Sequence, residues 1–135
     1  MREYIDSSHI LYYLYCILKD YTDEEAGHYI SQTEIIKLLK EKYDVEPDRK
    51  TVKKRLDDLV DLCPITGIEI RHIPGLNGGY QMVSRQFDAS EVMLLVDMVQ
   101  SSESLKKKQK KQLEEKLLGL VSKEQAEKIN EQNAH

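Results

Sequence analysis

One proline, Pro47, lies between two amphipathic stretches of similar length and limits what the first half of the chain can fold into. The stretch before it, SQTEIIKLLKEKY (31–43), begins with a Ser-x-x-Glu capping box and continues with apolar residues at helical spacing. The stretch after it, DRKTVKKRLDDLVD (48–61), begins with an aspartate suited to an N-cap and repeats that spacing. Proline cannot continue a helix and favours an extended backbone in the residue before it. The sequence therefore predicts two helices joined by a short turn, a helix-turn-helix arrangement.

The spacing of apolar residues changes from helical to alternating after this pair. In GIEIRHIPGLNGGYQMV (67–83), Ile68 and Ile70 alternate with charged residues before a Pro-Gly and an Asn-Gly-Gly step. Such alternation around a glycine-rich turn is typical of a β-hairpin, predicted here over 68–83. A further helix is predicted upstream in SSHILYYLYCILKDYTD (7–23), where a serine can cap a stripe of aliphatic residues. A helix, a helix-turn-helix and a hairpin, in this order, are typical of a winged helix-turn-helix domain.

The second half of the chain is predicted to be helical. A second capping box precedes VMLLVDMVQSS (92–102), which is apolar nearly all round and so favours burial on more than one side. The next stretch, SLKKKQKKQLEEKLLGLV (104–121), is amphipathic, and a serine after it can cap a short final helix. The predicted fold class is mostly α with a small β-hairpin: a winged helix-turn-helix domain over 1–87, followed by a helical extension over 88–135.

The helix predicted over 48–61 carries its charges in an order that its own stability does not favour. Its cations precede its anions, although the helix dipole favours the reverse, and the pairs Lys53–Asp57 and Lys54–Asp58 run in the weaker direction. In a winged helix-turn-helix domain this helix lies in the major groove with its N-terminal end foremost, where cations meet phosphates and base edges. The candidate DNA-binding residues are Lys50, Thr51 and Lys54 for base edges and nearby phosphates, Arg49, Lys53 and Arg55 for phosphates, Ser31, Gln32 and Thr33 at the start of the preceding helix, and Arg71 and Asn77 on the wing, with His72 behind them.

A mixed-charge helix is more often a solvated surface, and this chain contains its own example. Five lysines between residues 106 and 111 precede Glu114 and Glu115 in the same inverted order, with no helix-turn-helix around them. Charge order alone therefore decides little. The prediction depends on the proline break and the glycine-rich hairpin on either side of the helix.

The composition limits the other function classes. The chain has a formal net charge of −4, and the excess of acids lies in residues 1–30, so the middle of the chain can still present a cationic patch. The two cysteines lack a pairing framework, which predicts a cytoplasmic protein, and the four histidines lack metal-ligand spacing, so no metal or other cofactor is expected. A DNA-binding function would make the protein nucleoid-associated. No stretch is long enough to cross a membrane. Neither a nucleophile–base pair nor a phosphate-cradling glycine loop appears, so no catalytic residues are assigned and an enzyme is not expected.

Three segments, RKTVKKRLDDL (49–59), GGY (78–80) and FDASEVMLLVDMVQSS (87–102), resemble the N-terminal region of bacterial WYL-domain transcriptional regulators. The resemblance runs from about Ile10 to Ile129 and implies a DeoR-like winged helix-turn-helix. Members of this family normally continue into a ligand- or nucleic-acid-sensing WYL domain. The 135 residues contain no Trp-Tyr-Leu motif. The sensing function and a small-molecule effector are therefore not expected from them, and the chain is either a short form or a fragment of a longer regulator.

The apolar stretch 92–99 needs a surface to cover it. We expect a second copy of the chain, because such regulators resemble symmetric dimers that read palindromic sites, with half-sites about one helical turn of DNA apart. The alternative is that these residues close the core of a single chain. The candidate dimer-interface residues are Val92, Leu95, Val96, Val99, Leu113 and Leu117.

The leading functional hypothesis is a sequence-specific double-stranded DNA-binding transcriptional regulator, expected to act as a repressor on a palindromic operator. The alternative is a winged-helix protein-interaction module, such as an antirepressor or an adaptor, that does not bind DNA. Winged helices are used for both purposes, and a fold alone does not decide between them.

Overall fold

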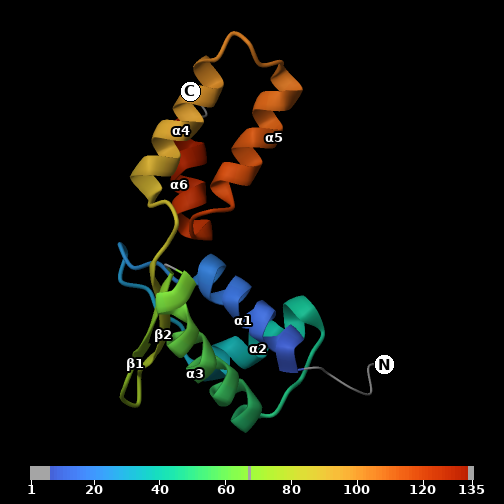
Figure 1. Ribbon diagram of the computed structural model, residues 1–135, viewed down its shortest axis with the longest axis vertical. Coiled ribbons are helices and arrows are strands. Elements are labelled where there is room, and N and C mark those ends of the chain that lie inside the picture. Colours follow the sequence, from blue (N-terminus) through green and yellow to red (C-terminus); the bar gives the residue numbers. More distant parts are fainter. Residues whose placement is uncertain (1–6, 67, 134–135) are drawn as a thin grey trace. The chain divides into compact units, whose positions relative to one another are not determined.

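The computed structural model describes residues 7–66 and 68–133 and divides into two compact units (Figure 1). We call Met1–Ser84 the N-terminal unit and Arg85–His135 the C-terminal unit. The division falls slightly before the boundary expected between residues 87 and 88. The described residues are mostly helical with one antiparallel hairpin, so the predicted fold class, mostly α with a small β-hairpin, is confirmed.

The described part of the N-terminal unit consists of three helices and a hairpin (Figure 1). In chain order these are α1 (Ser7–Tyr21), α2 (Gln32–Tyr43), α3 (Arg49–Thr66), β1 (Glu69–Ile73) and β2 (Gly79–Ser84). All three helices and both strands contribute apolar side chains to one core. Its fully buried members include Leu14, Ile17, Ile35, Leu39, Val52, Leu56 and Met82.

Two aspartates shape the turn between α2 and α3. Asp44 ends α2 in the left-handed conformation (φ 53°), and its N–H donates to the carbonyl of Lys40 at 3.2 Å. Aspartate is one of the few residues other than glycine that adopt this conformation readily. Asp48 begins α3, because its carboxylate accepts the N–H of Thr51 at 2.7 Å. The two caps set where α3 starts relative to α2, as the break at Pro47 predicts.

The helix α3 is longer than its sequence suggests. The predicted end is Asp61, whereas the helix continues to Thr66 and includes Pro64 in its last turn. A proline removes one backbone donor, and here that donor would have reached the carbonyl of Val60. The last turn of α3 therefore has one backbone hydrogen bond fewer than an uninterrupted helix.

The strand β2 pairs with β1 on one side and with Ile30, two residues before α2, on the other. Within the hairpin, His72 lies opposite Tyr80. On the outer side, Tyr80 donates its N–H to the carbonyl of Ile30 at 2.8 Å and accepts the N–H of Ile30 at 3.0 Å. Gly79 permits this approach, because a Cβ at this position would lie 2.2 Å from the Ile30 carbonyl oxygen. The base of the hairpin is therefore held against the start of α2.

Buried polar side chains fix the loop between α1 and α2 beneath the hairpin. The Thr22 hydroxyl donates to the carbonyl of Leu18 at 2.6 Å and accepts the N–H of Met82 at 3.0 Å, and α1 ends just before it. The Gln81 amide donates to the carbonyl of His28 at 3.0 Å. These bonds satisfy polar groups that would be costly to bury unpaired.

The described part of the C-terminal unit is entirely helical. Its helices are α4 (Ala89–Ser101), α5 (Lys107–Leu118) and α6 (Lys123–Asn133), and α4 and α5 run side by side (Figure 1). The predicted capping box at the start of α4 is present: Asp88 accepts the N–H of Glu91 at 2.9 Å, and Glu91 accepts the N–H of Asp88 at 3.0 Å. The core of this unit contains Val92, Val96, Val121 and Ile129.

This core corrects part of the predicted dimer interface. Val92 and Val96 are completely buried inside the unit and are not available to a partner. Leu95 and Val99 are half-buried, Leu117 packs against the core, and Leu113 is exposed. The apolar surface of α4 lies elsewhere, at Leu94 and Met98, each 61% exposed. Within its unit, α4 thus fills the core with one side and leaves Leu94 and Met98 open on another, although its composition favours burial on more than one side.

Candidate nucleic-acid interface

The helix α3 turns its apolar residues inward and its first cations outward. Val52 and Leu56 are fully buried, whereas Lys50, Lys53 and Lys54 are exposed. These three lysines, with Thr51 and Asp57, line a shallow groove along the helix. The orientation inferred from the helical period is therefore confirmed for the lysines and for the core residues between them.

The acidic second half of α3 neutralises only one of these three lysines. Lys53 Nζ lies 3.2 Å from the Asp57 carboxylate, and this hydrogen bond raises the pKa of Lys53 above its ordinary value. Lys50 and Lys54 form no ion pair within the described ranges 7–66 and 68–133. Two exposed positive charges at the start of α3 are thus not held in an ion pair by any other described residue.

Arg55 lies on the flank of α3 and is less accessible than the lysines. Its side chain is 21% exposed, and its guanidinium lies 3.2 Å from the Asp58 carboxylate. Its Nε atom is buried without a hydrogen-bond partner among the residues that the structure describes. Of the predicted phosphate contacts on α3, Arg55 is therefore the one whose charge is largely engaged inside the protein.

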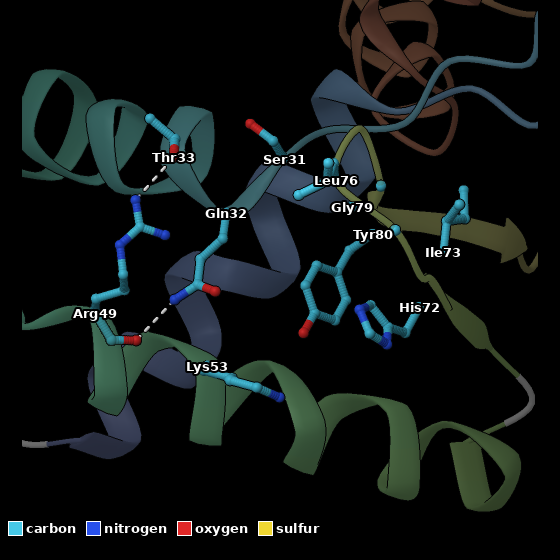
Figure 2. A pocket seen from close by; sticks show the side chains of 12 residues that line it. Ser31, Gln32, Thr33, Arg49, Lys53, His72, Ile73, Leu76, Gly79 and Tyr80 are labelled. Atoms are coloured by element: carbon cyan, nitrogen blue, oxygen red, sulfur yellow. Dashed lines mark hydrogen bonds between the residues drawn. The ribbon is translucent and has the colours of Figure 1, made fainter.

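Hydrogen bonds lock the beginning of α2 to the beginning of α3. The Gln32 side-chain amide donates to the carbonyl of Arg49 at 2.7 Å, and the Arg49 guanidinium donates to the Thr33 hydroxyl at 2.8 Å. Figure 2 shows both bonds crossing the space between the two helices. Ser31 caps α2 by accepting the N–H of Glu34 at 3.2 Å. The sequence named Ser31, Gln32 and Thr33 as phosphate donors, and the structure joins two of them, Gln32 and Thr33, to Arg49.

A cavity of about 220 Å³ lies where α2, α3 and the hairpin meet (Figure 2). Two cations line it, Arg49 and Lys53. None of the described residues that line it carries a carboxylate. The remaining lining residues are Ser31, Gln32, Thr33, His72, Ile73, Gly75, Leu76, Gly78, Gly79 and Tyr80.

The hairpin contributes His72 and Tyr80 to this cavity. The two rings are stacked, with their centroids 4.7 Å apart. They share one face of the hairpin because cross-strand partners point to the same side of a sheet. Burial and the nearby Asp57 carboxylate raise the pKa of Tyr80, so its hydroxyl keeps its proton at neutral pH. Sequence reasoning missed Tyr80 as a site residue, although its alternation with Met82 carried the signal.

The two predicted wing contacts lie away from the cavity. Arg71 lies opposite Gln81 in the hairpin register, so its side chain points to the face opposite His72. Asn77 is exposed at the hairpin tip, next to the fully exposed side chain of Leu76. His72 and Arg71 therefore lie on opposite faces of the hairpin, and His72 is the one that lines the cavity.

Other kinds of site find little support in the described residues. No three of their histidine, cysteine, aspartate or glutamate side chains are grouped so as to hold a metal ion. None of the helices in the part of the chain that the structure describes is long and apolar enough to span a membrane. Comparison of the chain with protein-family models, with curated proteins and with solved structures finds no match.

Proposed function

We propose that the protein is a sequence-specific, double-stranded DNA-binding transcriptional regulator that acts as a repressor, and that its N-terminal unit serves as a winged helix-turn-helix domain. The observation that carries this proposal is the start of α3, where Lys50 and Lys54 are exposed and form no ion pair with another residue that the structure describes. The resemblance to the N-terminal region of WYL-domain regulators supports the same function.

In this proposal α3 enters the major groove with its N-terminal half foremost. Lys50, Thr51 and Lys54 meet base edges and nearby phosphates, the contacts that such a helix makes in the groove. Asp58 and Asp61 lie further along the helix and stay clear of the polyanion, whereas Asp57 lines the same groove with its charge paired to Lys53. This placement accounts for the charge order of α3, which helix stability alone does not favour.

The hairpin then acts as the wing. Its tip extends the exposed Leu76 and Asn77, and an apolar side chain beside an amide suits contact with the sugars and floor of a minor groove. Arg71, which is exposed on the outer face of the hairpin, contacts a flanking phosphate in this proposal.

We further propose that the regulator binds a palindromic operator as a homodimer through the C-terminal unit. The exposed apolar pair Leu94 and Met98, one helical turn apart on α4, replaces the buried Val92 and Val96 at the centre of the proposed interface. A two-fold dimer would present two copies of α3 to two half-sites.

The test is a salt titration of duplex binding by the full chain, on duplexes first selected from a random pool. Each phosphate contact contributes about 0.9 to the slope of log K against log salt concentration. Lys50→Ala with Lys54→Ala should weaken binding and lower this slope by about 2 if both lysines reach phosphates.

The matched control is Lys37→Ala with Lys42→Ala, which removes the same charge from exposed positions on α2. It should leave the slope almost unchanged. Equal effects of the two double variants would show that only net charge matters and that α3 is not the recognition helix. If the unaltered chain binds no duplex even at low salt, the proposal is wrong and a protein-interaction module becomes the better description.

A further inference from the structure

The first residues of α5 include a dense group of lysines that the function proposed for α3 does not use. Five lysines lie within six consecutive residues: Lys106, Lys107, Lys108, Lys110 and Lys111. In a sequence alone, such a run is most often a solvated surface. The surroundings of these lysines in the C-terminal unit indicate a binding surface instead.

One of the five lysines has a structural role that the others do not share. Lys110 is half-buried, and its ammonium donates to the carbonyl of Gln100 at 2.8 Å, which ties the start of α5 to the end of α4. The other four are exposed. Three of these, Lys107, Lys108 and Lys111, fall within about 100° of the helix circumference, because successive residues are about 100° apart. We call these three residues the lysine face.

The acids that follow along α5 do not neutralise the lysine face. None of its three lysines forms an ion pair with a residue in the ranges 7–66 and 68–133 that the structure describes. Glu114 accepts a hydrogen bond from the Gln100 amide instead. Glu115, one turn beyond Lys111, is exposed. The lysine face therefore keeps its positive charge.

This arrangement of charge opposes the stability of α5. The lysine face lies at the N-terminal end of the helix, which the helix dipole already makes positive. Lys107 and Lys111 are like charges four residues apart, a spacing at which they destabilise a helix. A bound polyanion offsets both effects, because it brings negative charge to the same end of the helix.

The rest of α5 does not suit a protein surface or a bilayer as the partner. Protein interfaces have an apolar, often aromatic centre from which lysine is depleted, and a helix that lies in a bilayer buries an apolar face. Leu113 is the one exposed large hydrophobic residue of α5, at 38% exposure. It points away from the lysine face, because it follows Lys107 by six residues, which is about 240° around the helix.

A double-stranded nucleic acid suits the lysine face better than a single strand. Single strands are bound largely by aromatic side chains on which the bases stack, and residues 88–135 contain no phenylalanine, tyrosine or tryptophan. The phosphates of a duplex are bound by lysines through the release of counterions. Lys107 to Lys111 span about 6 Å along α5, over which duplex DNA presents about three phosphates.

We propose that the lysine face of α5 is a second DNA contact, which binds the phosphates of double-stranded DNA without regard to sequence. This contact goes beyond the function proposed for α3 and does not depend on it. A contact made only to phosphates adds affinity for every duplex and no preference among sequences. It keeps the protein on DNA outside the operator, along which the protein can slide.

The test compares two triple variants of the full chain on a scrambled duplex over a range of salt concentrations. Lys107→Gln with Lys108→Gln and Lys111→Gln should weaken binding and lower the slope of log K against log salt concentration by about 2.7, at about 0.9 for each phosphate contact. The control is Lys37→Gln with Lys42→Gln and Lys116→Gln, which removes the same charge from exposed positions elsewhere and should hardly change the slope. The Tm of the first variant should not fall, because its lysines do not stabilise α5.

Further comparisons separate the lysine face from α3. Preference for a selected operator over the scrambled duplex should survive the α5 substitutions and be lost in Lys50→Ala with Lys54→Ala. If the α5 substitutions remove binding that the α3 substitutions leave intact, the lysine face stands and α3 is not the recognition helix.

Three results would overturn the proposal. The first is an equal slope for the two triple variants, with the α3 substitutions still effective, which would leave the proposed function standing alone. The second is tighter binding to a single strand of the same length than to the duplex. The third is an effect of the α5 substitutions on binding to phosphatidylserine vesicles but not to DNA, which would identify a membrane surface.

Discussion

Replacing Gly79 with alanine tests whether the hairpin must lie against the start of α2. The added Cβ would lie 2.2 Å from the Ile30 carbonyl oxygen, 2.6 Å from its carbon and 3.0 Å from the Ser31 nitrogen. All three are backbone atoms, which cannot move aside as the end of a flexible side chain can. The backbones of β2 and of Ile30 would have to move apart by about 1 Å before the added Cβ reached an ordinary contact distance.

This separation sets the size of the effect. The two hydrogen bonds between Ile30 and Tyr80, at 2.8 and 3.0 Å, would stretch beyond useful length, and each contributes about 1 kcal/mol net. Alanine also lowers the conformational entropy of the unfolded chain, which offsets the loss of stability by about 0.5 kcal/mol. The net loss is about 1.5 kcal/mol, or about 6 to 12 °C in Tm for a domain of this size.

Tyrosine fluorescence reports on unfolding of the N-terminal unit alone, because all eight tyrosines of the chain lie before residue 85. The matched control is Gly119→Ala in the C-terminal unit. Gly119 has φ −68°, and a Cβ there would meet nothing closer than 3.4 Å, so the Tm reported by the tyrosines should not change. An unaltered Tm in Gly79→Ala would refute the reasoning, since the hairpin would then have room that the structure denies it.

Three further results are expected. Leu56→Ala should lower the free energy of unfolding by about 3 kcal/mol, because this side chain is fully buried in the core, and a loss below about 1 kcal/mol in a urea titration would contradict that packing. The hydroxyl and the N–H of Thr51 lower the pKa of Asp48 below 3.8, so its ionised cap stabilises α3 above that pH and the contribution is lost as the pH falls further. Asp48→Asn, which caps without titrating, should therefore show a flatter dependence of the urea midpoint between about pH 2 and 4, and superimposable curves would argue against the linkage. Leu94→Gln with Met98→Gln should abolish self-association in sedimentation at unchanged stability, whereas a monomeric unaltered chain at tens of micromolar would remove the proposed dimer.

The limits of the elements could be read from the sequence where short-range interactions determine them. The break at Pro47 and the capping box at the start of α4 involve residues three or four apart, and both appear as predicted. The hairpin follows equally from alternation and its glycine-rich tip. The end of α3 was misplaced, because no local signal before Pro64 distinguishes a helix that stops at Asp61 from one that continues.

The candidate site was only partly readable. The helical spacing correctly predicted that Lys50, Lys53 and Lys54 are exposed, because burial of Val52 and Leu56 leaves the helix only one orientation. The alternation of side chains along each strand predicts that His72 and Tyr80 lie on the same face of the hairpin. It does not show which face borders α3. That choice depends on pairing between Ile30 and Tyr80, which are far apart in the sequence.

The sequence by itself determined the order of helices, turn and hairpin, and the position of the cations on α3, because capping, chain breaks and hydrophobic period act over a few residues. Only the tertiary structure decided which surfaces these elements leave open. The helix α4 shows the difference: its sequence is apolar nearly all round, and nothing local distinguishes Val92 from Leu94. Packing against the other helices of its unit buries Val92 completely and leaves Leu94 61% exposed, because burial depends on where neighbouring helices lie. In the same way, the cavity beside Arg49 lies where the hairpin meets the start of α2, a close approach that Gly79 permits.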